Sequence, residues 1–162
     1  MYWKDKHKLI RELELMQIEP MEYPVVTYQL DKIIRVCAPW VAHYARSGKL
    51  RFIFAYNVRW QPSELGLNDS LAMQQKGFIG IEYKMLRWAQ PYEFDYAIHA
   101  LLHELAHIEH NDHSSAFYTW FDKLRKNFNA VTGRNIRDQG YYIRVCAESR
   151  ESAARARAVP GR

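Results

Sequence analysis

The chain has 162 residues, of which 48% are hydrophobic and 25% charged, a composition typical of one globular domain with a substantial core. It has no apolar run of the roughly 18 residues that a membrane span needs and no apolar signal-peptide core near its start, so we expect a cytoplasmic protein that does not contact membranes. The net charge of +5 is compatible with nucleic-acid contact but identifies no partner. Without a signal peptide, Cys37 and Cys146 are expected to be reduced.

The first 60 residues predict two helical regions and a strand. Residues 4–18 mix charged and apolar side chains in an amphipathic pattern, which predicts an N-terminal helical extension within residues 1–24. Residues 28–46 predict a second helix that Pro39 should kink or divide and Gly48 should end. The alternating residues 49–58 predict a strand.

The rest of the chain predicts one more strand and then helices. We expect a loop at 61–70, a strand over 77–86, and helices over 93–110 and 115–128. The segment "YYIRVC" at 141–146 predicts a late strand or an extended arm, and residues 148–162 a flexible C-terminal tail. Strands that precede helices indicate an α+β domain, which we assign to residues 25–147.

The segment "HELAHIEHNDH" at 103–113 holds four of the seven histidines. His103, Glu104 and His107 form the pattern H-E-x-x-H. On a helix the two histidines project from one face and can bind one metal ion. Zinc lowers the pKa of a bound water to about 7, so the adjacent Glu104 could accept its proton as a general base. The pattern therefore predicts one catalytic Zn²⁺ ion.

A catalytic zinc needs a third protein ligand, and two histidines compete for that position. His110 would continue the helical stripe of His103, whereas His113 requires the helix to end and the chain to turn back. Asn111 tolerates the left-handed conformation, and Ser114 is a good N-cap for the next helix. These signals favour His113 as the ligand and leave His110 as a neighbouring group, a substrate contact or the alternative ligand.

Chance clustering on a surface helix and a structural zinc are the competing interpretations. The spacing, the adjacent glutamate and the buried apolar face coincide, which argues against chance. A structural zinc site usually has four ligands, commonly cysteines, and the two cysteines here are far apart in the sequence. His99, one turn before His103, is interpreted as a packed or capping residue.

The segment "HELAHIEHNDHSSAF" resembles the WLM family of zinc peptidases, which are relatives of the SprT/Spartan proteases. It also resembles the YgjP-type metallopeptidases. The WLM resemblance extends upstream through "LGLN" at 65–68, "GFIGIEYKMLR" and "FDYAIHALLHELAH", and covers roughly residues 25–130. The WLM turn usually carries Gly-Pro where this chain has Asn111-Asp112. A metzincin is disfavoured because no methionine follows His113 to form a Met-turn.

The resemblance implies a small zincin-like domain of the minigluzincin type, with a twisted, mostly antiparallel sheet packed on the H-E-x-x-H helix. It implies an edge strand at 78–87 that binds an extended protein or peptide substrate, and a metal-assisted hydrolysis of the peptide bond. A tyrosine could stabilise the oxyanion, with Tyr118, Tyr141 and Tyr142 as candidates. Packing is the competing interpretation of each.

Related proteases cut proteins crosslinked to DNA, so the resemblance also suggests DNA–protein crosslink repair and weak binding of single-stranded DNA. Basic side chains could contact phosphate and aromatic ones could stack on bases; an ordinary solvated helix face is at least as good an interpretation. The candidate residues are Lys123, Arg125, Lys126, Arg134, Arg137, Trp120 and Tyr118. The alternative functions are a DNA-independent peptidase that cuts a specific partner, and a non-catalytic binding module stabilised by zinc.

Overall fold

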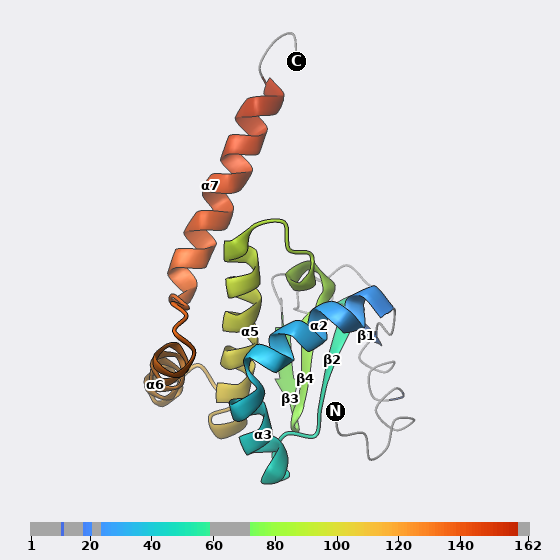
Figure 1. Ribbon diagram of the computed structural model, residues 1–162, viewed down its shortest axis with the longest axis vertical. Helices are drawn as coiled ribbons and strands as arrows, with labels where there is room; N and C mark the ends of the chain where they lie inside the picture. Colours follow the sequence, from blue (N-terminus) through green and yellow to red (C-terminus); the bar gives the residue numbers. More distant parts are fainter. Residues whose placement is uncertain (1–10, 12–17, 21–23, 59–71, 159–162) are drawn as a thin grey trace.

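The computed structural model describes residue 11 and residues 18–20, 24–58 and 72–158. These residues form an α+β structure, as predicted, with one sheet and helices packed against it (Figure 1). The sheet order is β1-β2-β4-β3, where β1 is Ile18–Pro20, β2 is Phe52–Val58, β3 is Ala72–Gln75 and β4 is Phe78–Glu82. The central β2–β4 pairing is parallel and the two outer pairings are antiparallel. The described sheet is therefore mixed and mostly antiparallel.

Two helices replace the single run predicted between residues 28 and 46. Helix α2 spans Pro24–Val36 and α3 spans Ala38–Arg46, so the proline in the run does divide it. Pro39 lies in the first turn of α3, where its missing N–H breaks no helical hydrogen bond. Gly48 follows α3 with a φ of +77° and donates its N–H to the carbonyl of Ala45, which confirms the predicted stop.

The predicted edge strand is wrong, because β4 lies inside the sheet and the shorter β3 is its described edge. A tight hairpin joins them through Lys76 and Gly77, whose φ angles are 53° and 84°. Two consecutive positive φ angles are typical of the hairpin turns that match strand twist. Strand β4 ends at Glu82, because its side chain accepts the N–H of Lys84 and starts the 3₁₀ helix η1 (Tyr83–Leu86).

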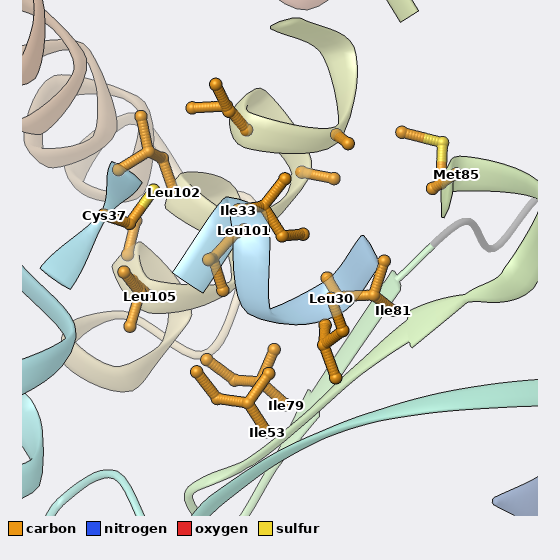
Figure 2. Close-up of a cluster of buried hydrophobic side chains, with 14 of the residues drawn as sticks. Leu30, Ile33, Cys37, Ile53, Ile79, Ile81, Met85, Leu101, Leu102 and Leu105 are labelled. Carbon is orange, nitrogen blue, oxygen red and sulfur yellow. The ribbon is translucent and has the colours of Figure 1, made fainter. Parts of the chain in front are cut away.

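Helix α5 (Pro91–Glu109) packs with α2 on one face of the sheet, and their contact forms the core. Figure 2 shows aliphatic side chains from both helices meeting those of the strands. Each such side chain contributes about 1.5–3 kcal/mol when fully buried. The core is what holds α5 in a fixed position on the sheet. Its labelled members include Leu30, Ile33, Leu101, Leu102, Leu105, Ile53, Ile79 and Ile81, all at most 3% exposed.

Two further helices follow, α6 (Ser115–Thr132) and α7 (Gln139–Ala158). The predicted strand or arm at 141–146 is wrong, since these residues are the first half of α7. Residues 148–158, expected in a flexible tail, continue the same helix, which projects beyond the rest of the described fold (Figure 1). The loop between the helices is held by Asn129, whose side-chain amide donates to the carbonyl of Ile136 and accepts its N–H.

Three predictions concern residues outside the described ones. Residues 4–10 and 12–17 of the helix predicted over 4–18 are among them, whereas Ile18 belongs to β1. The predicted loop at 61–70, with its "LGLN" segment, and residues 159–162 are also outside. Within the described parts of the chain, no helix combines the length and apolarity that a bilayer crossing requires.

Candidate metal centre

The H-E-x-x-H segment lies in the second half of α5, as predicted. The helix begins with Pro91 and a reciprocal cap, in which Gln90 and Glu93 satisfy each other's backbone N–H groups. Its apolar stripe is buried in the core and fixes the rotation of the helix. The opposite stripe presents His103 and His107 one turn apart, with ring centroids separated by 4.8 Å.

A short turn after α5 brings His113 back to the same place. His110 leaves the helix in an extended conformation, with φ −137° and ψ 107°. Ser114 then caps α6 by accepting the N–H of Phe117, as predicted, and the carboxylate of Asp112 accepts the N–H of Ser114. The predicted left-handed Asn111 is wrong: among the described non-glycine residues only Lys76 has a positive φ. The chain instead bends at Asn111 and Asp112 without a positive φ, directly after the extended His110.

The three imidazoles converge on one point. The Nε2 atoms of His103, His107 and His113 lie 3.1–3.2 Å from one another. Nitrogens at about 2.0–2.1 Å from a tetrahedral zinc are about 3.3–3.4 Å apart, so the triangle has nearly the size that zinc requires. These histidines are therefore close enough to bind one metal ion.

The second ring nitrogen of His107 fixes its tautomer. Its Nδ1 lies 2.9 Å from the carbonyl oxygen of His110, which can only accept, so Nδ1 carries the proton. In the neutral ring Nε2 then presents a lone pair to the centre of the triangle. This arrangement is typical of metal-binding histidines, whose other nitrogen commonly donates to a carbonyl.

Burial favours the neutral rings of His103 and His107 and the protonated carboxyl group of Glu104. Burial, followed by the charge of His107, lowers the pKa of His103 to about 3, and burial also lowers the pKa of His107. Glu104 is 7% exposed, and burial raises the pKa of its carboxyl group to about 8. A bound cation would favour the ionised carboxylate. The site thus combines two neutral imidazoles and the exposed His113 with a buried carboxyl group.

Aromatic side chains of α6 pack against the histidine rings. Phe117 is fully buried and stacks on His107 with ring centroids 4.2 Å apart and a 16° angle between planes. Phe121 packs edge-on against both His103 and His99. Neither phenylalanine was predicted to contact the site, although their spacing of four on the apolar face of a capped helix indicates a buried pair.

His110 and His99 lie near the histidine triangle but contribute no nitrogen atom to it. The side chain of His110 stays outside the triangle; its carbonyl orients His107 and its ring lies 6.4 Å from Trp120. His99 is 2% exposed, as expected for a packed residue, and its Nε2 has no hydrogen-bond partner among the described residues. Burial lowers the pKa of His99 to about 4.

Only one of the three candidate tyrosines borders the histidine triangle. Tyr118 is 47% exposed and its ring stacks near that of His113, at 6.1 Å. Tyr142 is buried and its hydroxyl accepts the N–H of Arg137. Tyr141 packs under the guanidinium groups of Arg137 and Arg144. The contacts of the last two are those of packing residues.

The described sheet edge, β3, lies next to α5. Gln74 of β3 donates a hydrogen bond from its side chain to the carbonyl of His107, at 3.4 Å. The same side chain accepts the N–H of Gly77 at 3.0 Å and so links the hairpin to the helix. Neither β3 nor this role of Gln74 was predicted, because a four-residue strand of mixed polarity carries little periodic signal.

Most of the basic residues proposed for DNA contact already have partners within the fold. Arg125 donates to the carbonyl of Ile136, Arg134 pairs with Asp95 and lies over Phe94, and Arg137 covers Tyr141. In the described structure, the two lysines of the set, Lys123 and Lys126, have no ion pair.

Residues 86–156 match the family model of the WLM domain, which supports the resemblance to the WLM family. That family is associated with a metallopeptidase-like function. The matched segment contains all of α5, α6 and the histidine triangle, and it continues past residue 130 into α7. It does not include β1–β4, so the upstream part of the resemblance stays a prediction. No curated protein and no solved structure matched the chain.

Proposed function

We propose that this chain is a zinc-dependent endopeptidase with a zincin-type site. His103, His107 and His113 would hold the metal, and Glu104 would act as the general base. The convergence of three histidine Nε2 atoms within 3.2 Å is the observation that carries the proposal, and the buried Glu104 directly follows His103 in the helix.

The donor set favours zinc in a catalytic rather than a structural role. Imidazole nitrogens suit Zn²⁺ and other late transition metals better than Mg²⁺ or Ca²⁺, which prefer oxygen. Three protein ligands leave one position of a tetrahedral ion open, whereas a structural site closes with four. His113 is exposed, so the open side of the triangle faces solvent and substrate can reach it.

The residues around the triangle would have separate roles in peptide hydrolysis. Zinc bound there would supply a Lewis acid that polarises the substrate carbonyl and acidifies water. Glu104 would accept a proton from the attacking water and pass it to the leaving amine. Phe117 and Phe121 exclude water from beneath the rings, and the carbonyl of His110 holds His107 in the tautomer that presents Nε2.

The substrate would lie along β3. An extended peptide can pair with an exposed strand edge, and β3 is attached to α5 through Gln74. Tyr118, which is exposed beside His113, is the tyrosine best placed to donate a hydrogen bond to the oxyanion. DNA-bound or DNA-crosslinked proteins remain the narrower substrate proposal, with Lys123 and Lys126 as the phosphate contacts.

Metal analysis of the purified protein, combined with casein digestion, tests the proposal. We expect close to one zinc per chain, loss of cleavage after treatment with 1,10-phenanthroline, and recovery when zinc is restored. A zinc-replete chain that cleaves no casein or unstructured peptide would instead support the zinc-stabilised binding module. If cleavage is seen, adding single-stranded DNA at low and high salt separates the DNA-linked peptidase from the DNA-independent one, since phosphate contacts weaken steeply with salt.

A further inference from the structure

A cavity of about 300 Å³ lies between α3 and α6. Its walls are aromatic: Trp40 and Tyr44 come from α3, and Trp120 comes from α6. The two helices lie near the C-terminal part of α5 in Figure 1. They are tied together by a 3.0 Å hydrogen bond from the indole N–H of Trp40 to the side-chain carbonyl of Asn127. The walls of the cavity are thus held by a specific contact.

Two of the residues that line the cavity, Lys123 and Asn127, offer hydrogen-bond donors to a ligand. Lys123 is exposed and has no ion pair or hydrogen bond to any described residue. Asn127 uses its carbonyl to accept from Trp40, which leaves its NH₂ group available. His43 also lines the cavity, and no acidic residue is among the lining residues. The cavity therefore offers one fixed positive charge and an amide donor beside aromatic surfaces.

These features define the chemistry of a ligand. Aromatic walls favour a planar ring, and about 300 Å³ is at the small end of ligand pockets, which suits one or two rings. A single lysine and an amide match a carboxylate, with one negative charge, better than a phosphate monoester, which carries about −1.5 to −2. We propose that this cavity is a binding pocket for a small aromatic carboxylate.

The pocket is separate from the histidine triangle. Phe117 and Phe121 occupy the side of α6 that supports the triangle, whereas Trp120, Lys123 and Asn127 line the pocket. The chemical steps of the proposed hydrolysis use none of these three residues, and only the narrower DNA-linked proposal shares Lys123 with the pocket. The pocket can therefore bind its ligand whether or not the chain is a peptidase.

Titration calorimetry with 1-naphthylacetate, using its neutral amide as the matched ligand, tests the proposal on the intact chain. We expect saturable binding of one carboxylate per chain and at least tenfold weaker binding of the amide. The exchange Lys123→Gln should abolish this discrimination. Lys126→Gln, an exposed lysine on the same helix outside the pocket, should preserve it. The absence of saturable binding, equal affinities for the two ligands, or equal effects of the two exchanges would overturn the proposal.

Discussion

Replacing Glu104 with glutamine should stabilise the metal-free protein, by an amount that grows with pH. Glu104 is 7% exposed, and burial raises its pKa from 4.5 to about 8. The folded chain therefore keeps this proton up to about pH 8, whereas the unfolded chain releases it near pH 4.5. Between these values unfolding releases a proton, so the residue makes the folded state less stable as pH rises.

The size of the effect follows from the two pKa values. Ionisation of Glu104 in the unfolded chain lowers the free energy of unfolding by about 1 kcal/mol at pH 5 and about 3 kcal/mol at pH 7, since each pKa unit is worth about 1.4 kcal/mol. A glutamine side chain at this position would have the same shape without a charge to desolvate. The variant Glu104→Gln should therefore gain about 2 kcal/mol more at pH 7 than at pH 5. Saturating zinc should shrink the gain, because a nearby cation stabilises the carboxylate.

Urea unfolding with a chelator present, at both pH values, measures the difference. Glu109→Gln is the matched control: it lies on the same helix, but its carboxylate is 30% exposed and pairs with Lys49. A stability gain for Glu104→Gln that is the same at pH 5 and pH 7, or that falls with pH, would refute the reasoning. It would mean that the carboxyl group is solvated in the folded chain.

Three further predictions concern neighbouring positions. His113→Ala should remove most of the bound zinc, whereas His110→Ala should retain it, because only the former supplies a nitrogen to the triangle; equal losses in metal analysis would contradict this. Burial lowers the pKa of His99 from 6.5 to about 4, so the free energy of unfolding falls as the pH falls between these values, by about 2 kcal/mol at pH 5. His99→Phe should abolish this loss of stability. Urea unfolding at pH 5 and 7 checks it, and an unchanged pH dependence would refute it. Gly77→Ala should cost about 1–3 kcal/mol, and more than Gly48→Ala: both have positive φ, but only at Gly77 would a methyl group collide with a backbone carbonyl, that of Lys49. Equal urea midpoints of the Gly77→Ala and Gly48→Ala variants would contradict the expected collision at Gly77.

The parts of the structure with a strong local signal were predicted correctly. The dividing Pro39, the helix stop at Gly48, the strand at β2, the helix carrying the histidines and the N-cap Ser114 each follow from a backbone or capping preference that acts within a few residues. The choice of His113 over His110 also came from local signals, although Asn111 does not take the left-handed conformation that was part of the argument.

The incorrect predictions concern features that depend on contacts distant in the sequence. The edge position of β3 is set by its pairing with β4, and a parallel β2–β4 pairing leaves no trace in either strand alone. The segment "YYIRVC" is rich in β-branched and aromatic residues, yet it is helical, with Tyr142 stacked on Tyr96 of α5. Tertiary packing there outweighs a strand propensity of at most about 1 kcal/mol.

The rate of peptide cleavage by zinc-loaded Glu104→Gln tests the central proposal most directly. The variant should bind as much zinc as the unaltered chain, because the group of potential ligands consists of His103, His107 and His113 and does not include Glu104. Cleavage of an unstructured peptide should fall by about 10²–10⁴, since an amide cannot accept the proton of water. Equal zinc content with this loss of rate is the predicted result. Equal zinc content with the rate retained would contradict the proposal that Glu104 is the general base.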